Sequence, residues 1–421
     1  MKGQIWFFYL FIVVFIVLAD LYVYRGISQL TQNMGARASG WIRGAYITLS
    51  AAGLLVFTWL FLSRERYSHE EFFRHISAFF GFFILFYVPK MLFMVSLLFK
   101  DLADLSIRLW SNFQTGVPAN GDSGVPLSRT DFILRIGLVL SMIPFVSILH
   151  GIFRGKYNFK VSRVPLSFDN LPPAFEGLRI VQISDLHLGS FGEDTTEISR
   201  AIQIINDLMP DYLLFTGDIV NNRALEMDPF IPVLKKLKAK HGKFSILGNH
   251  DYGTYYPWES ENDYRENMEK LYRSHEEAGF RLLRNERVYL EREGQKIVLA
   301  GVENWGIPPF PQYGDLDKAL NGTVKDDFTI LLSHDPSLWD AEILPKTKVD
   351  LTLSGHTHGM QFAINIPGWK WSPVKMKYPR WSGLYQEGSQ YLYVNIGLGF
   401  IAFPGRVGTP PEITEFTFTR T

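Results

Sequence analysis

The sequence predicts an α/β domain of two packed sheets flanked by helices, preceded by four membrane-spanning helices. Two observations lead to this prediction. The first third of the 421-residue chain is strongly apolar, whereas the rest has the mixed composition of a soluble domain. In that second part, strand-length apolar runs first alternate with helical patterns and then follow one another closely, which is typical of two-sheet α/β folds.

Four apolar segments are long enough to cross a bilayer core, which needs about 20 residues. They cover about Ile5–Val23, Ala45–Leu62, Ala78–Phe99 and Phe132–Phe153. The first could instead be a signal peptide, but it lacks a small-residue cleavage site and three more spans follow. Buried helices of a soluble protein are a second alternative. Runs such as Phe79–Phe86 argue against it, because they have no polar face.

Few polar residues interrupt these spans: Asp20, Lys90, Arg135 and His150. Lys90 follows Pro89 in mid-span, where a charge is costly. It could line a polar cavity or contact a lipid headgroup. We favour the alternative, in which it pairs with Asp20 or a water molecule at a proline-kinked helix.

The segment between the third and fourth spans has two parts. Apolar residues recur at helical spacing from Leu102 to Phe113 and predict either a helix in the membrane interface or an ordinary packed helix. Thr115–Ser128 is rich in Gly, Pro and Ser and predicts a loop. An even number of spans places both chain ends on one side. The distribution of Lys and Arg slightly favours the cytoplasm for that side, in a multi-pass protein of the inner (cell) membrane.

The overall composition excludes several kinds of site. Basic and acidic residues balance at 42 each, which argues against bulk electrostatic capture of nucleic acid. The chain has no cysteine, which excludes disulfides, thiolate metal sites and a cysteine nucleophile. Any metal must therefore be held by nitrogen and oxygen.

We expect a transmembrane region at 1–153, a linker at 154–165 and a catalytic domain at 166–421. The predicted helices of the domain are Glu197–Leu208, Pro229–Lys240 and Asp263–Ala278. The predicted strands are Leu166–Phe168 (an edge strand), Leu178–Ser184, Tyr212–Thr216, Lys243–Leu247, Val288–Glu291, Ile297–Val302, Thr329–Ser333, Leu351–Ser354, Tyr391–Ile396 and Ile413–Phe418.

Five polar motifs occur where predicted strands end: Asp185-Leu186-His187, Gly217-Asp218, Gly248-Asn249-His250-Asp251, Ser333-His334 and Gly355-His356-Thr357-His358-Gly359. In open α/β folds, functional groups gather beyond the carboxyl ends of strands. Taken singly, each motif has an ordinary explanation, such as a turn, a surface loop or a helix cap. All five in this order predict a two-metal phosphoesterase.

The residue types in the motifs suit two divalent cations. The candidate ligands among them are two Asp, one Asn and up to five His, and a carboxylate has two oxygens and can bridge two ions. Manganese, iron or zinc fits this oxygen and nitrogen set better than magnesium or calcium. If the backbone stays extended, the alternation of His356 and His358 would point both rings the same way.

These motifs resemble the pattern of the calcineurin-like metallophosphoesterases over about Leu178–Phe418. The resemblance implies a four-layer α/β/β/α sandwich. It also implies one metal on Asp185, His187 and His358, a second on Asn249, His334 and His356, and Asp218 bridging both. His250 would be the catalytic residue, facing the substrate phosphate and protonating the leaving oxygen or stabilising the transition state.

Further features resemble a membrane-bound branch of this family. They are the four spans together with Gly301–Trp305 and Gly408–Ile413. That branch includes bacterial phosphodiesterases and relatives of UDP-2,3-diacylglucosamine hydrolase. One departure separates the chain from the protein phosphatases, which carry an Asp three residues after the bridging Asp. Here that position is Asn221, so either Asn221 or Asp251 is left to support His250.

A mixed basic and aromatic segment follows the last motif: Trp369, Lys370, Trp371, Lys375, Lys377, Tyr378, Arg380 and Trp381. It could grip an anionic lipid headgroup, bind nucleic acid, or be a folded loop with exposed charges. We favour the lipid. Candidate substrate contacts are Lys375, Arg380 and Arg406, although Arg406 could equally be an ordinary surface arginine.

Three functions are open. We favour a membrane-anchored hydrolase that cleaves a phosphodiester or pyrophosphate bond in a phospholipid or nucleotide-linked lipid, such as a lipid A precursor. The second is a phosphodiesterase acting on soluble substrates, with the spans as an anchor only. The third is an inactive membrane sensor or transporter, and the intact motif set argues against it.

Overall fold

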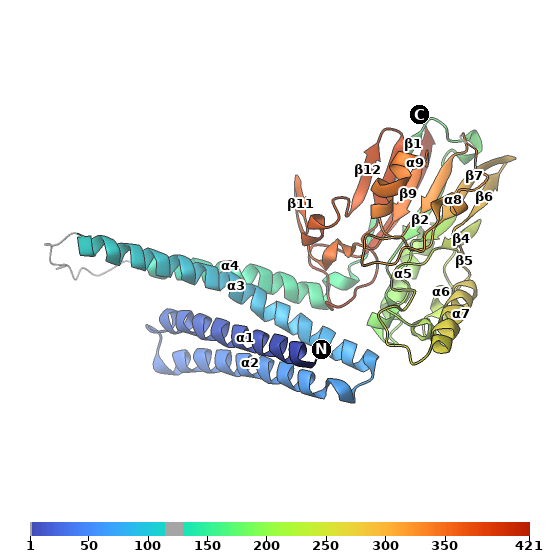
Figure 1. Ribbon diagram of the computed structural model, residues 1–421. Coiled ribbons are helices and arrows are strands. Elements are labelled where there is room, and N and C mark those ends of the chain that lie inside the picture. Colours follow the sequence, from blue (N-terminus) through green and yellow to red (C-terminus); the bar gives the residue numbers. More distant parts are fainter. Residues whose placement is uncertain (1, 114–128, 325) are drawn as a thin grey trace. The chain divides into compact units, whose positions relative to one another are not determined.

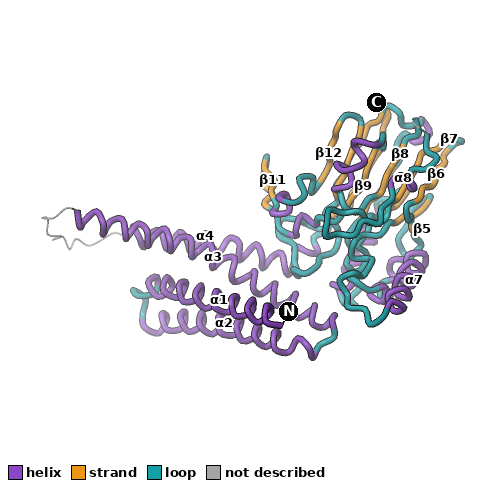
Figure 2. The backbone as a smooth tube through the Cα atoms, viewed as in Figure 1, coloured by secondary structure: helices purple, strands orange, loops and turns teal. Residues whose placement is uncertain are grey.

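The computed structural model describes residues 2–113, 129–324 and 326–421 of the chain. These residues form two compact units, Met1–His150 and Gly151–Thr421. The first is helical and the second contains the described strands (Figures 1 and 2).

The first unit consists of long apolar helices. They are α1 (Lys2–Leu30), α2 (Ala36–Ser63), α3 (His69–Phe113) and α4 (Arg129–Phe153), the last of which runs into the start of the second unit. Each contains a segment long and apolar enough to cross a membrane. Many of their large apolar side chains point outward, and Trp41, for example, is 80% exposed. Lipid would cover such side chains.

The structure changes one local prediction in this unit. The apolar stretch from Leu102 to Phe113 is no separate interfacial helix, because α3 continues through it without a break. The interior proline of α3, Pro89, does not end the helix either. The predicted loop Thr115–Ser128 lies outside the described residues.

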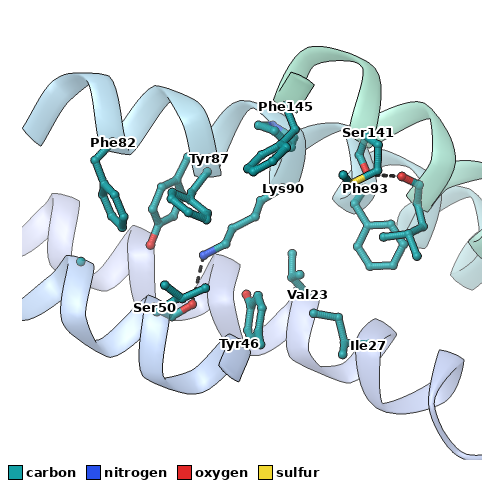
Figure 3. A pocket seen from close by; sticks show the side chains of 16 residues that line it. Val23, Ile27, Tyr46, Ser50, Phe82, Tyr87, Lys90, Phe93, Ser141 and Phe145 are labelled. Carbon is teal, nitrogen blue, oxygen red and sulfur yellow. Dashed lines mark hydrogen bonds between the residues drawn. The ribbon is translucent and has the colours of Figure 1, made fainter. Parts of the chain in front are cut away.

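A charged pair and the hydroxyl groups bonded to it join three of these helices in mid-span. Lys90 Nζ lies 2.5 Å from Asp20 Oδ1, which confirms the predicted pairing. Asp20 on α1 also accepts hydrogen bonds from Tyr46 (2.8 Å) and Ser50 (3.0 Å) of α2 and from Tyr87 (2.8 Å) of α3. Lys90 also donates to Ser50 Oγ at 3.0 Å and lines a cavity of about 190 Å³ with mostly apolar walls. Figure 3 shows Lys90 pointing toward Ser50. A network that satisfies both charges lets them lie within the membrane.

The second unit is built on two six-stranded sheets and one separate hairpin. The first sheet has the order β1-β14-β2-β3-β4-β5, with β2 to β5 parallel. Its strands are β1 (Lys160–Phe168), β2 (Arg179–Ile183), β3 (Tyr212–Phe215), β4 (Gly242–Ser245), β5 (Arg281–Leu282) and β14 (Glu412–Arg420).

The second sheet has the order β12-β13-β9-β8-β7-β6, and its central strands β7, β8, β9 and β13 are parallel. Its strands are β6 (Glu286–Arg292), β7 (Gln295–Gly301), β8 (Thr329–Leu332), β9 (Leu351–Ser354), β12 (Gly383–Glu387) and β13 (Gln390–Val394). The hairpin pairs β10 (Ile364–Ile366) with β11 (Trp369–Trp371).

Side-chain alternation along the strands produces four layers. In β2, Ile180 points between the sheets, whereas Val181 and Ile183 point to the helices α5 (Thr196–Asp207), α6 (Ile231–Leu234) and α7 (Glu261–Glu277). The far side of the second sheet is covered by α8 (Leu316–Ala319), the short helix Trp339–Ile343 and α9 (Leu344–Lys346). The result is the expected α/β/β/α order (Figure 1).

The domain differs from the sequence prediction at several places, and strands β5 and β12 and the short helices α8 and α9 are among the elements that were not predicted. Helix α6 covers only Ile231–Leu234, because the residues after it form tight turns such as the Lys236 N–H to Val233 carbonyl bond. Strand β1 begins at Lys160, earlier than the predicted edge strand Leu166–Phe168. The hairpin β10–β11 was not predicted, because its short strands are exposed and lack a buried pattern.

Candidate metal centre

The five motifs meet at one edge of the sandwich. Asp185 follows β2, Asp218 follows β3 and Asn249 follows β4 in the first sheet. His334 follows β8 and the 355–359 motif follows β9 in the second. Because each group of strands is parallel, their carboxyl ends lie side by side, which brings together residues more than 170 positions apart.

One cluster consists of Asp185, His187 and His358, all buried. His187 Nε2 lies 3.0 Å from His358 Nε2, and His358 Nε2 lies 3.2 Å from Asp185 Oδ1. Two ring nitrogens and a carboxylate oxygen therefore converge on one point. These are the three residues that the family resemblance implies for the first metal.

A second cluster consists of Asp218, His334 and His356. His334 Nε2 lies 3.1 Å from Asp218 Oδ2, and His356 Nδ1 lies 3.3 Å from His334 Nε2. Asn249 belongs to the same group, with its Oδ1 2.8 Å from His356 Nδ1. The predicted residues of the second metal are thus assembled around one point as well.

Asp218 lies between the two clusters. Its Oδ2 is 3.1 Å from His334 Nε2 in the second cluster and 3.7 Å from His187 Nε2 in the first. Its Oδ1 accepts the His250 N–H at 2.8 Å. Gly248 allows this close approach, because a Cβ there would lie 2.2 Å from Asp218 Oδ1.

These spacings fit a metal's coordination sphere. Ligand bonds to zinc-like ions are about 2.0–2.2 Å long, so neighbouring ligand atoms lie about 3.0–3.5 Å apart. The separations of 3.0 to 3.3 Å within the clusters match that range. All ligand atoms of each cluster lie within 4.8 Å of one another. The residues present therefore fit one divalent cation per cluster.

Backbone conformation at these residues is unusual. Asp185, His187, Asp218, His356 and His358 all have positive φ, between 47° and 71°. Such conformations are uncommon for residues other than glycine and concentrate at functional sites. They also overturn one expectation. The chain at His356 and His358 is not extended, so the two rings diverge, one to each cluster.

Neighbouring groups hold the ligand rings in place. His334 Nδ1 donates to the Thr216 carbonyl at 2.7 Å, and His187 Nδ1 lies 3.1 Å from the side-chain oxygen of Asn221. His356 Nε2 lies 2.8 Å from the hydroxyl of Tyr378, which donates to Asp335 Oδ2 at 3.2 Å. Such outer contacts fix which ring nitrogen faces a metal. The sequence analysis did not identify the roles of Tyr378 and Asp335, and only the position of Asp335 beside His334 could have suggested one of them.

His250 lies beside the first cluster, with its ring centre 4.9 Å from that of His187. Its Nδ1 lies 2.8 Å from the main-chain carbonyl of Asn221. A carbonyl only accepts, so Nδ1 donates and Nε2 is the nitrogen available for chemistry. The ring of Tyr255 packs against His250 at 4.8 Å. Asn221 thus supports His250 through its main chain and His187 through its side chain.

Asp251 has a different role from the one considered for it. Its buried carboxylate accepts the N–H groups of Asp218 (2.8 Å), Ile219 (2.8 Å), Val220 (3.2 Å) and Gly248 (2.8 Å). It therefore ties together the two loops that follow β3 and β4. Burial and the negative charge of Asp218 raise the pKa of Asp251 to about 7.

The electrostatics of the site favour ionised carboxylates. Burial alone would raise the pKa of Asp185 and Asp218, but the adjacent imidazoles of His358 and His334 lower the pKa of these two carboxyls below their ordinary value. Burial lowers the pKa of His187 and His356. In His334, by contrast, burial is outweighed by the charge and hydrogen bond of Asp218, which raise the pKa to about 10, so a metal bound there would displace a proton from this ring.

The three candidate substrate contacts lie in different surroundings. Arg406 is 1% exposed and donates to the Gly399 carbonyl (2.7 Å), and its Nη2 is 3.1 Å from His358 Nδ1. Burial lowers the pKa of Arg406 to about 10. Arg380 is paired with Asp340 and Glu387, and Lys375 is exposed. Substrate contact by these residues stays a prediction.

Comparison with known proteins agrees with this architecture. A family model described as "Probable Calcineurin-like phosphoesterase, transmembrane domain" matches residues 3–156. Another, described as "Calcineurin-like phosphoesterase", matches residues 178–360.

Individual relatives extend the match. The uncharacterized metallophosphoesterase YkuE of Bacillus subtilis is 36% identical over 258 residues, which are 60% of this chain and 82% of that protein. The transmembrane protein with metallophosphoesterase domain of Bos taurus is 29% identical over 294 residues, 67% of this chain and 62% of that protein. The chain thus spans less than two thirds of the bovine relative. With four helices fit to span a membrane and a two-sheet domain, the chain is a multi-pass membrane protein that belongs to the calcineurin-like metallophosphoesterases, a family of metal-dependent phosphoester hydrolases.

Proposed function

We propose that the chain hydrolyses a phosphodiester or pyrophosphate bond of a lipid, either a phospholipid or a nucleotide-linked lipid of the lipid A precursor type. The observation that carries the proposed chemistry is the pair of ligand clusters with Asp218 between them. In this proposal Asp185, His187 and His358 hold one cation, and Asn249, His334 and His356 hold the other. Manganese, iron and zinc are the ions that suit these ligands.

Two bound cations would activate a water molecule and neutralise the phosphoryl oxygens. The residues of the chain supply the rest. Asp218 sets the spacing of the two clusters, and Asp251 fixes the loop that carries Asp218. His250, oriented by the Asn221 carbonyl, presents Nε2 to the substrate. A protonated Nε2 would donate its proton to the leaving oxygen, a contribution of about 10²–10⁴-fold in rate.

The membrane-spanning helices support a lipid substrate. A soluble substrate does not require four spans for its hydrolysis, whereas a lipid-linked phosphate stays at the membrane surface. Exposed Lys375 lies in the segment after the metal-site motif and could contact an anionic headgroup. We also propose that the catalytic domain faces the cytoplasm of an inner (cell) membrane. A reporter fused to the C-terminus tests which side of the membrane the catalytic domain faces.

The test compares two substrates on the full-length protein in lipid bilayers. One is a panel of phospholipid and nucleotide-linked lipid phosphates, and the other is bis-p-nitrophenyl phosphate. We expect metal-dependent release from at least one lipid at a kcat/KM well above that for the soluble diester. Metal-dependent turnover of the soluble diester alone would instead support the soluble-substrate alternative. Absence of both activities, with both metals bound, would support an inactive sensor.

A matched pair of variants assigns the activity to the site. Asp218→Ala should abolish hydrolysis and weaken metal binding at both sites, because it removes the carboxylate that lies between the two clusters. His250→Ala should abolish hydrolysis while metal is retained. Undiminished turnover by a pure, metal-free preparation would refute the proposed chemistry.

A further inference from the structure

The hairpin β10–β11 carries an exposed apolar face. In its antiparallel register, Ile364 lies opposite Trp371 and Ile366 opposite Trp369. Residues that are opposite, or two apart, point to the same side of a hairpin, so these four side chains share one face. In the described chain they remain between 36% and 53% exposed. Isolated exposed apolar residues are common, but a continuous face with two tryptophans marks an interaction site.

The opposite face of the hairpin is attached to the domain. Lys370 lies on that face, and its Nζ donates to Ser382 Oγ at 2.7 Å and lies 4.8 Å from the centre of the Trp381 ring. At the base, buried Ser372 donates to the Gly359 carbonyl at 2.7 Å. The hairpin is therefore held in one orientation by its polar side. The apolar side is opposite to this attached face and therefore points away from the domain.

Several residues that follow the hairpin in the sequence are also exposed, and they are apolar or basic. Met376, just after β11, is 83% exposed. Lys375 and Lys377, on the turn after β11, are exposed as well. Tryptophan and aliphatic side chains next to lysines are the composition of protein surfaces at a membrane interface, where rings lie at headgroup level and lysines meet anionic lipid.

We propose that this face, Ile364, Ile366, Trp369 and Trp371, inserts into the interface of the bilayer that holds the four spans. Lipid is the expected partner of this face, because the domain is joined directly to the membrane-spanning helix α4 and therefore always stays close to the bilayer. Ser372, at the base of the hairpin, donates to Gly359, which directly follows His358 of the first cluster. The contact would therefore bring the metal centre to the lipid surface. It stands independently of which bond the enzyme cleaves.

The test uses the absence of cysteine in the chain, which makes single-site labelling direct. Full-length Ile366→Cys is labelled with bimane and placed, one protein per disc, in nanodiscs of phosphatidylethanolamine and phosphatidylglycerol. The control is Glu277→Cys, at an exposed site near the end of α7. We expect nitroxide-bearing lipids to quench the 366 label at least threefold more than the 277 label. We expect iodide in the water to show the reverse order.

Each other outcome overturns the proposal. Equal quenching at both sites would place the hairpin in water. A label protected from iodide but not quenched by lipid would place the face against protein. Trp369→Ser combined with Trp371→Ser should reduce lipid quenching at position 366 to the control level, and unchanged quenching would exclude insertion through this face. If that variant does not fold, the comparison of the labels at positions 366 and 277 in the protein with both tryptophans still tests the proposal.

Discussion

Replacing Asp251 by alanine should open the loops that carry the metal ligands. The carboxylate accepts the N–H groups of Asp218, Ile219, Val220 and Gly248, all in buried surroundings. A buried donor left without a partner costs roughly 1–3 kcal/mol. Water can enter the space vacated by the carboxylate, so the cost per donor should be close to about 1 kcal/mol. The four donors together then destabilise the closed loops by about 4 kcal/mol. Since about 1.4 kcal/mol corresponds to tenfold, local opening should become about 10³-fold more frequent.

The assay is amide hydrogen exchange of the full-length protein in detergent, followed by mass spectrometry of the peptides that cover 217–221 and 248–251. Asp251→Asn gives a graded control, because each carboxylate oxygen serves two of the four donors and the amide keeps one oxygen. It should lose about 2 kcal/mol, or about 30-fold in protection. Asp228→Ala removes an exposed ion pair with Lys270 and should change protection less than about threefold. A change below tenfold in Asp251→Ala would refute the proposed role.

Three further predictions concern other parts of the molecule. Tyr378→Phe removes the hydroxyl that holds His356 and should weaken binding of one of the two metals about 10- to 100-fold, as measured by calorimetry with Mn²⁺; unchanged binding of both would contradict it. His250→Gln should lower kcat about 10²–10⁴-fold while two metals stay bound, and loss of metal by this variant would contradict a purely catalytic role. Asp20→Leu alone should destabilise the helical unit by about 3–5 kcal/mol because it removes the ion-pair partner of Lys90, whereas Asp20→Leu with Lys90→Leu should recover most of that loss in detergent unfolding. Equal loss in both variants would contradict it.

Much of the fold follows from local sequence patterns. Strands such as β3 and β8 are almost entirely apolar because both of their faces are buried, one against helices and the other against the opposite sheet. The polar motifs at their ends then mark where functional groups gather. The position of the motifs at strand ends predicted that they meet, because parallel strands bring their carboxyl ends together, and the family resemblance implied how they divide into two clusters.

Other features depend on tertiary contacts that no local pattern encodes. Tyr378 reaches His356 from a loop 22 residues further along the chain. Arginine is a residue type usually found at the surface, yet the guanidinium of Arg406 is buried and donates to main-chain carbonyls. The positive φ at His356 and His358 could not be predicted either, because the strained conformation is imposed by the surrounding loops.

The most direct test of the account is metal stoichiometry, because the central claim is that Asp218 joins two cation sites. We expect the full-length protein, loaded with Mn²⁺ or Zn²⁺, to hold two ions per chain by mass spectrometry of the metals. His358→Ala and His334→Ala should each reduce the tightly bound content to one, because they belong to different clusters. Asp218→Ala should weaken both sites. A single ion in the wild-type protein, or loss of only one ion in Asp218→Ala, would contradict a centre bridged by this residue.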